Sequence, residues 1–411
     1  MTQPSTPARP SAAPWPATRE AGFERLNRFL PRAGTRYAQS RNFDRGAGRH
    51  EAVSCLSPYL RHGLLEEPDV LLPVIARHGR EAAAKFVDEV FWRTYFRGWM
   101  AHHPEIWQRY GSSVQEATDQ RRATAPLDRA LTAAEQGQTG IPAFDHWAQE
   151  LLATGYLHNH ARMWFASIWI FTLRLPWVLG ADWFLRQLMD GDPASNTLGW
   201  RWVAGLHTRG KTYLARRDNI LRFTDGRLDP GPDLAREALA LEDAPAQRET
   251  LQLPPATSAP PLAEAWLVTD EFCGSLPDAG DSLRLGLACD EQLAAARGER
   301  AASFSAAALG QAVNPGADSS NRVFATVDGL LSSPLAEGWQ ELHCWSVPFG
   351  PVAQQLDQLE AALAARGRRL VRWTRAHDAR AWPHARRGFF GLKKRIPALL
   401  DRLEQEAPGG A

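Results

Sequence analysis

Cysteine is scarce in this chain of 411 residues, which contains only Cys55, Cys273, Cys289 and Cys344. These residues lie far apart, without the paired spacing that zinc sites and iron–sulfur clusters use. The same scatter argues against a disulfide framework and fits a reducing compartment. We therefore expect no cysteine-based metal site, no metal cofactor and a cytoplasmic protein.

Long apolar runs are missing as well. No stretch approaches the roughly 18 apolar residues that a membrane-spanning helix needs, so we expect no membrane partner. The segment from Met1 to Thr18 is rich in Pro, Ala and Ser and lacks the apolar centre of a signal peptide. Its composition predicts a disordered N-terminus over residues 1–22.

Charge of either sign is nearly balanced, because 47 Lys and Arg residues face 46 Asp and Glu residues. The halves differ: residues 1–226 hold 28 basic and 22 acidic residues, whereas residues 227–411 hold 19 and 24. A mildly basic first half suits phosphate binding only where its charges cluster. Tryptophan is abundant, with 11 of 16 before residue 227. Core packing is the commoner explanation for abundant tryptophan. The more specific hypothesis is that some of these side chains stack on an aromatic ligand.

Periodicity divides the chain into two parts, as its length suggests. Helical spacing of apolar residues runs almost continuously from Glu20 to Phe223, with prolines at helix starts or turns. The fold class is therefore mainly α: a helical domain at 23–226, a linker at 227–262 and a smaller α/β domain at 263–411. In the latter, strands are expected at 265–269, 282–288, 322–327, 341–347 and 369–374, and a helix at 354–366. No glycine-rich phosphate loop follows any of these strands.

Two segments of the helical half combine polar side chains with helix starts or faces. Ser54 and Ser57 stand beside Pro58, where they can cap a helix whose N-terminus suits a diphosphate, although most such serines only cap. Glu89, Trp92 and Arg93 share one helix face. They could grip a nucleobase, or form an exposed ion pair beside a core tryptophan.

Two further segments place polar groups among apolar neighbours. Asn159 and Met163 are one helical turn apart, and Arg162 lies between them, where burial without partners costs several kcal/mol. The segment from Asp190 to Trp202 holds two acids, an amide and a Trp-x-Trp pair. A calcium loop would need more oxygens at regular spacing. A flavin edge, with donors and acceptors, fits this set better.

Taken together, the segments closely resemble the FAD-binding domain of the DNA photolyase/cryptochrome family. The family shows S-x-LSPYL, E-x-x-WR, TG-x-P-x-x-D, TG-x-x-HN-x-x-RM, W-x-x-G-x-x-(W/Y)F and D-x-D-x-A-x-N-x-x-x-W-x-W. All six occur here in order, the last four at 139–145, 154–163, 177–184 and 190–202. The resemblance covers about half the chain and implies an all-helical domain that binds FAD.

The resemblance also implies roles for single residues around FAD. Ser54 and Ser57 would hold the diphosphate, with Tyr37 and Arg41 as upstream contacts. Other cofactor positions are Asn159 near the adenine, Arg162 paired with Asp190 beside the isoalloxazine, Asp192 at the polar edge of the ring and Asn196 facing flavin N5.

Electron transfer and substrate binding are assigned in the same way. Trp200 and Trp177 match the first two members of the family's tryptophan chain. Residues that match contacts to a cyclobutane pyrimidine dimer are Glu89, Trp92, Asn159, Met163 and Trp202. Trp92 and Trp202 would stack on the flipped-out lesion, and Glu89 would stabilise the dimer radical.

The chain departs from the family pattern at several positions. The third chain tryptophan would fall near Thr124, where there is none. His160 and Gln149 replace family arginines, which puts contact with DNA phosphates in doubt. Residues 210–217 replace the final FNP signature, and the basic residues 211, 216, 217 and 222 either compensate or form a solvated helix face.

The α/β antenna domain of the family is absent before Phe23. Instead, residues 388–397 in the C-terminal part resemble a G-(F/Y)-F element near the domain junction of family members. Residues 263–411 are therefore either a relocated, degenerate antenna-like domain or an unrelated α/β module.

The function that the resemblance implies is that of a blue-light-driven lyase of the deoxyribodipyrimidine photolyase kind. Reduced FAD would donate an electron to a pyrimidine dimer in damaged DNA. Two alternatives stay open: a cryptochrome-like flavin photoreceptor without repair activity, with a protein partner at the C-terminal domain, and a vestigial FAD-binding scaffold. Fold and cofactor do not decide among them.

Overall fold

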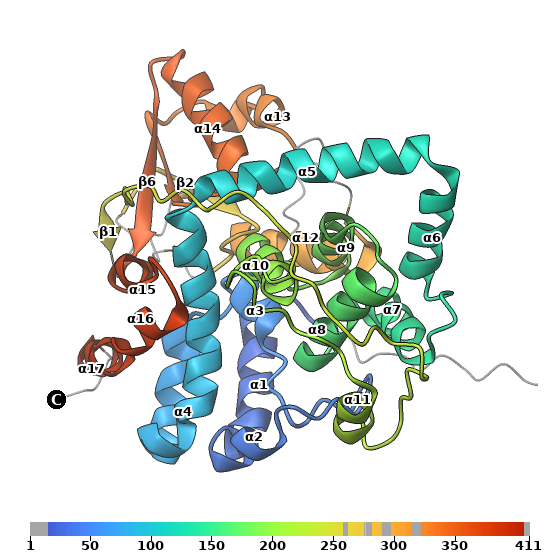
Figure 1. Ribbon diagram of the computed structural model, residues 1–411. Helices are drawn as coiled ribbons and strands as arrows, with labels where there is room; N and C mark the ends of the chain where they lie inside the picture. The colour runs from blue at the N-terminus through green and yellow to red at the C-terminus, as the bar shows by residue number, and fades with distance from the viewer. Residues whose placement is uncertain are drawn as a thin grey trace, which may run out of the picture.

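The computed structural model describes residues 15–257, 262–274, 276, 282–289, 297–314 and 322–406. Its first part is helical (Figure 1). The helices are α1 Arg19–Phe29, α2 Thr35–Ser40, α3 Ser57–Arg61, α4 Glu67–Ala101, α5 Pro104–Ala123, α6 Ala125–Gln136, α7 Pro142–Thr154, α8 Asn159–Ser167, α9 Trp177–Gln187, α10 Pro193–Val203 and α11 Arg217–Phe223. The helical region begins at Arg19 rather than at the predicted Phe23, because Thr18 caps α1 by accepting from the amide of Ala21.

The second part combines helices and a sheet. Its helices are α12 Glu299–Val313, α13 Val327–Leu331, α14 Pro351–Ala364, α15 Ala376–Ala381, α16 Phe389–Lys393 and α17 Ile396–Glu406. Its strands are β1 Ala256–Thr257, β2 Ala265–Thr269, β3 Leu283–Leu287, β4 Val323–Phe324, β5 Glu341–Trp345 and β6 Arg369–Arg375. The prediction of a mainly helical fold followed by a smaller α/β part is confirmed.

Prolines mark the helix starts, as the sequence indicates. Pro104, Pro142 and Pro193 are the first residues of α5, α7 and α10. At this position the missing amide donor costs nothing, since it would have no partner inside the helix. The long helix α4 contains a break at Gly79, whose φ of 73° lies in the left-handed region. The half of α4 that follows this break carries several of the candidate site residues.

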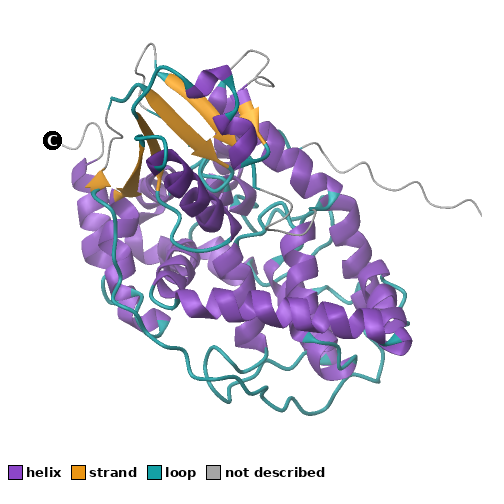
Figure 2. Cartoon of the chain, turned by 90° about the horizontal axis from the view of Figure 1, so that it is seen from above, coloured by secondary structure: helices purple, strands orange, loops and turns teal. Residues whose placement is uncertain are grey.

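The strands form one parallel sheet in the order β1-β6-β5-β2-β3-β4. They gather on one side of the molecule, beside the helices (Figure 2). Side chains alternate between its faces: Leu267 packs with Leu356 of α14, whereas Val268 joins a core with Phe304 of α12. The strand expected at 322–327 is shorter, because Thr326 caps α13 and turns the chain into a helix.

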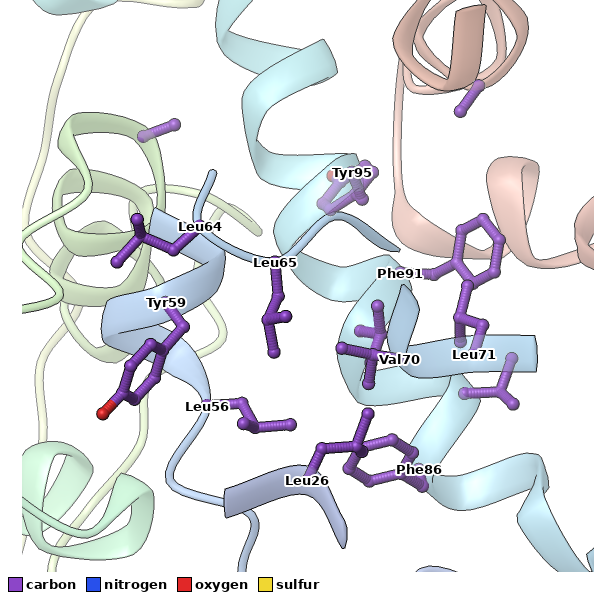
Figure 3. Close-up of a cluster of buried hydrophobic side chains, with 14 of the residues drawn as sticks. Leu26, Leu56, Tyr59, Leu64, Leu65, Val70, Leu71, Phe86, Phe91 and Tyr95 are labelled. Carbon is purple, nitrogen blue, oxygen red and sulfur yellow. The ribbon is translucent and has the colours of Figure 1, made fainter. Parts of the chain in front are cut away.

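The two parts share one hydrophobic core. Leu26, Tyr59 and Phe91 of the helical part belong to the same buried cluster as Phe304, Phe389 and Leu400 of the second part. Figure 3 shows the helical side of this cluster, with Phe91 and Tyr95 projecting from α4. Helices α15, α16 and α17 lie alongside α4 (Figure 1). The α/β part therefore packs directly against the helical part.

The predicted linker is itself docked on the helices over its described residues. The amide of Leu241 donates to the carbonyl of Ala204 at 3.0 Å, and that of Glu249 donates to His102 at 2.9 Å. The carboxylate of Asp243 pairs with Arg109 and Arg201 at 2.9 and 2.6 Å. The segment then enters the sheet as β1. The exact domain boundaries stay predictions, but residues 228–257 are ordered against the helical part.

Buried ion pairs join the two parts. Arg97 of α4 lies 2.8 Å from Asp192 and 3.0 Å from Glu271, which follows β2. Arg61 of α3 lies 2.8 Å from the other oxygen of Glu271. All four side chains are less than a tenth exposed. Such pairs must stay complete, because a buried charge without its partner is strongly destabilising.

No helix in the described ranges has the length and apolarity to cross a bilayer.

Candidate functional site

A cavity of about 500 Å³ opens among α4, α8, α9 and α10. Its volume lies within the range of small-molecule sites. The predicted site residues that line it are Arg41, Glu89, Trp92, Asn159, Arg162, Met163, Asp190, Asn196, Trp200 and Trp202. They come from positions up to 161 residues apart in the chain, so their convergence is a result of the tertiary fold rather than of local spacing.

The charged pair at the inner side of the cavity is Arg162 and Asp190. Arg162 donates from Nη2 to Asp190 Oδ2 at 2.8 Å and from Nε to the carbonyl of Leu157 at 3.0 Å. Burial by itself would lower the pKa of Arg162. The charge and the hydrogen bond of Asp190 outweigh the effect of burial, so the pKa of Arg162 is raised. The guanidinium is therefore charged and fixed. The predicted pairing of these two residues is confirmed.

The second oxygen of Asp190 is the clearest sign that a ligand completes this site. Among the residues that the structure describes, buried Asp190 Oδ1 has no hydrogen-bond partner, and the same holds for Ser195 Oγ on the cavity wall. Leaving such groups unpaired costs about 1–3 kcal/mol each. A ligand with hydrogen-bond donors and acceptors along one edge, such as a flavin, would satisfy them.

Asn196 is oriented by its neighbour on α9. Its Nδ2 donates to the carbonyl of Ala181 at 2.7 Å. A carbonyl can only accept, so this contact fixes the amide orientation and leaves Oδ1 as the acceptor on the cavity side. Asn196 thus presents a fixed acceptor, in keeping with the predicted place beside a flavin nitrogen that gains and loses a proton.

Arg41 and Glu89 form an ion pair at the other side of the cavity. Burial raises the pKa of Glu89, and Arg41 offsets part of that effect. Tyr37 lies behind the pair, packed edge-on against Phe86 at 5.2 Å, and its pKa is raised by burial. Tyr37 does not line the cavity, and its contact with the cofactor stays a prediction.

The indole ring of Trp92 is partly covered by a residue from the C-terminal part. Phe389 of α16 stacks on it with ring centroids 4.0 Å apart and an interplanar angle of 11°. Trp202 similarly stacks on Tyr213 at 5.5 Å. Both indoles line the cavity, yet each already has an aromatic neighbour. Sequence reasoning missed this role of Phe389, although its G-F-F motif was the available signal.

Asp192 stands outside the cavity lining. Its Oδ1 accepts from the amide of Ser195 at 2.8 Å and caps α10, and its Oδ2 accepts from Arg97 at 2.8 Å. Arg97 and Arg93 hold the pKa of Asp192 well below its usual range, against the effect of burial. Asp192 therefore shapes the N-terminus of α10, and its contact with the polar edge of the flavin ring stays a prediction.

Ser54 and Ser57 also lie away from the cavity lining. Ser54 Oγ accepts from the amide of Leu56 at 3.4 Å. Leu56 occupies the N-cap of α3, and no side chain caps this helix. The predicted capping by Ser57 is thus wrong, since Ser57 is already the first helical residue. Contact of the two serines with a diphosphate stays a prediction.

The tryptophans near the cavity are linked by ring contacts. Trp200 meets Trp169 edge-on at 6.1 Å and Phe184 at 5.2 Å. Gly180 allows this, because a Cβ at that position would lie 2.4 Å from Trp200 and 2.8 Å from Trp169. Trp177 instead contacts Tyr110 at 5.9 Å. The role of Trp177 stays a prediction, and Trp169 is a second neighbour for Trp200.

Comparisons with known proteins find relatives of the region that contains most of these cavity residues. Residues 86–237 match the family model described as the FAD binding domain of DNA photolyase. The chain is 36% identical over 206 residues to the deoxyribodipyrimidine photo-lyase of Thermus thermophilus, covering 49% of this chain and 46% of the relative. It is 29% identical over 213 residues to that of Escherichia coli, covering 49% and 42%. The chain thus spans about half the length of these curated relatives.

Solved structures give similar coverage. A class III photolyase from Agrobacterium tumefaciens is 27% identical with a TM-score of 0.43, covering 55% of this chain and 46% of that one. A cryptochrome from Synechocystis is 25% identical with a TM-score of 0.40, covering 51% and 43%.

Proposed function

We propose that the helical part of this chain, which is similar to the FAD binding domain of DNA photolyase, holds FAD, and that the protein repairs cyclobutane pyrimidine dimers in DNA under blue light. The observation that carries the proposal is the convergence of Glu89, Trp92, Asn159, Met163 and Trp202 on the cavity that also contains Asp190 and Asn196. Cofactor and lesion positions thus share one space, as direct electron transfer between them requires.

Bound FAD would supply light-driven electron transfer to the dimer. The protein would hold it through Asp190 Oδ1, while Asp190 Oδ2 pairs with Arg162, and through the fixed acceptor of Asn196. Phe184, Leu188 and Ala166 give the same space apolar walls.

Toward the substrate, Trp92 and Trp202 offer ring surfaces for two unstacked bases, each worth about 1–3 kcal/mol. Glu89 stands on the same face of α4 as Trp92 and is paired with Arg41; burial raises the pKa of Glu89, and Arg41 offsets part of that effect. The pair offers hydrogen-bonding groups to the polar edge of the dimer, where charge develops during reaction.

The test is a repair assay on an oligonucleotide with one pyrimidine dimer, in light and in darkness. Glu89→Gln should retain FAD but lower the repair yield, and Glu116→Gln, on an exposed face of α5, should match wild type. Trp92→Ala should bind the lesion about fivefold to 150-fold more weakly, from its stacking energy. A wild-type protein that binds FAD and shows no light-dependent repair would contradict the proposal.

One observation favours the alternative of a photoreceptor without repair activity. At the two positions where the family carries arginine, the polar groups are turned inward. His160 Nδ1 lies 2.8 Å from the carbonyl of Asn42, and Gln149 Nε2 donates to the carbonyl of Gly137 at 3.2 Å. Neither side chain replaces a phosphate contact. Equal affinity for dimer-containing and undamaged DNA at low salt would support this alternative.

A further inference from the structure

Four arginines gather around a cleft of about 590 Å³ on the side of α4 next to the cavity. We call this the arginine cleft and define it by Arg209, Arg248, Arg386 and Arg387. The four residues come from three separate segments: the loop after α10, the docked segment before β1 and the turn before α16. Its floor includes Tyr95 and Trp99 of α4.

The charge of the arginine cleft is uncompensated. All four arginines are exposed, and within the described ranges none has an ion pair or a side-chain hydrogen bond. No carboxylate lines the cleft. Acids outside the lining are Asp243, which pairs with Arg109 and Arg201, Glu242, which lines the neighbouring depression, Glu105, which accepts from the amide of Gln247, and Glu249, which follows Arg248 in the chain. Like charges brought together in this way repel each other until an anion joins them.

The surrounding residues hold the segment with Arg386 and Arg387 in place. The hydroxyl of Tyr95 donates to the carbonyl of Arg387 at 2.6 Å, and His102 Nε2 lies 3.1 Å from the carbonyl of Trp382. Gly98 allows α4 and this segment to pack closely, because a Cβ there would lie 2.7 Å from Trp382. Arg386 and Arg387 therefore project from a backbone that is held in place.

The arginine cleft and the cavity share an aromatic wall. Trp92 and Phe96 line the cavity, Tyr95 and Trp99 line the cleft, and the ring of Tyr95 contacts the rings of both Trp92 and Phe96. Seven residues of helix from Trp92 to Trp99 span roughly 10 Å at 1.5 Å per residue. One strand of duplex DNA places a phosphate about every 3.4 Å along its axis. The cleft thus lies within about three nucleotide steps of the cavity.

We propose that the arginine cleft binds backbone phosphates of the DNA strand whose damaged bases enter the cavity. The inference rests on the proposed repair function, and it names the residues that take the place of the family arginines absent at 149 and 160. Guanidinium groups suit phosphate because they can donate two parallel hydrogen bonds to it. Arg248, Arg386 and Arg387 lie outside the region that matches the family model, so the C-terminal part would contribute directly to DNA binding.

The test uses the full-length protein with FAD bound and a fluorescent duplex, with and without one dimer, titrated at several salt concentrations. The variant is Arg386→Gln combined with Arg387→Gln. The matched control combines Arg366→Gln with Arg402→Gln, which removes the same charge from two exposed positions, one just after α14 and one in α17. Flavin content is measured for every protein, so that a folding defect is seen separately.

Losing two phosphate contacts should reduce the salt slope, the change of log affinity with log salt, by about 1.8, which is roughly a 60-fold loss of affinity at 0.1 M salt. The loss should be equal on damaged and undamaged duplex, because phosphates carry no sequence information. Arg209→Gln removes one arginine, so it should reduce the salt slope by about half as much as the double variant does. The control variant should bind as wild type does.

Outcomes separate this inference from the proposed function. Weaker binding with a reduced slope supports the cleft, even if wild type shows no light-dependent repair and the repair proposal fails. Active repair together with an unchanged affinity and slope in Arg386→Gln/Arg387→Gln would overturn the cleft alone. A loss of affinity without a change of slope would also overturn it, as would an effect seen on anionic lipid vesicles and not on DNA.

Discussion

Replacing Glu271 by glutamine tests whether the contact between the α/β part and the helical part stabilises the whole chain. Glu271 accepts from Arg61 at 2.8 Å through one oxygen and from Arg97 at 3.0 Å through the other. Glutamine has nearly the same shape but offers one acceptor oxygen and an NH₂ group. One guanidinium would then face a donor in a region that water does not reach.

The cost follows from which partners remain. Removing one member of a buried ion pair costs about 3–5 kcal/mol. Arg97 keeps Asp192 at 2.8 Å, and Arg61 keeps the carbonyls of Gly191 and Asp270, each at 3.0 Å. These remaining contacts place the expected loss for Glu271→Gln at the lower end, about 3 kcal/mol in the free energy of unfolding.

The assay is urea unfolding of the full chain, followed by tryptophan fluorescence and by circular dichroism. The matched control is Glu360→Gln, which breaks a pair with Arg372 at 2.7 Å in which the glutamate is 52% exposed. Surface pairs contribute about 0–1 kcal/mol, so the control should hardly change stability. A loss below about 1 kcal/mol for Glu271→Gln, equal to that of the control, would refute the argument that this carboxylate fastens the two parts together.

Three further predictions concern the cavity, electron transfer and acid stability. Asp190→Asn leaves Arg162 without its ionic partner, so FAD should be retained at least tenfold less tightly, measured by flavin absorbance after gel filtration; unchanged flavin content would contradict this. Trp200→Phe should keep FAD but slow its photoreduction at least tenfold, measured by time-resolved absorbance; an unchanged rate would show that electrons enter elsewhere, and Trp169→Phe then tests the second neighbour. Burial, followed by the charge of Arg61, lowers the pKa of His62 to about 3. An unfolded histidine takes up its proton near pH 6.5. The contribution of neutral His62 to the free energy of unfolding is therefore complete above pH 6.5 and is lost as the pH falls toward 3, by up to a few kcal/mol. Urea midpoints between pH 7 and 4 should therefore fall less steeply in His62→Gln, and parallel curves would contradict the assignment.

The contacts between the two parts also predict the result of a truncation. A chain ending near residue 230 would leave Arg61 and Arg97 without Glu271 and would uncover the core that Phe304 and Phe389 complete. Such a fragment should not fold independently, and its flavin content does not report on the C-terminal part.

Local pattern was sufficient for the elements and for the short-range parts of the site. Prolines predicted the starts of α5, α7 and α10, because a proline can begin a helix and cannot continue one. The apolar run at 265–269 predicted β2, since a buried parallel strand is apolar on both faces. Helical spacing alone put Asn159 and Met163 on one face, where both line the cavity.

Tertiary structure decided the contacts between segments far apart in the chain. Phe389 stacks on Trp92 from 297 positions away, Asp192 turns from the cavity toward Arg97, and Arg209 meets Arg386 at the cleft. Periodicity reports which face of an element is apolar, but not which other element covers it. That choice depends on how α15, α16 and α17 dock on α4, and this docking places Phe389 of the C-terminal part against Trp92 in the cavity lining.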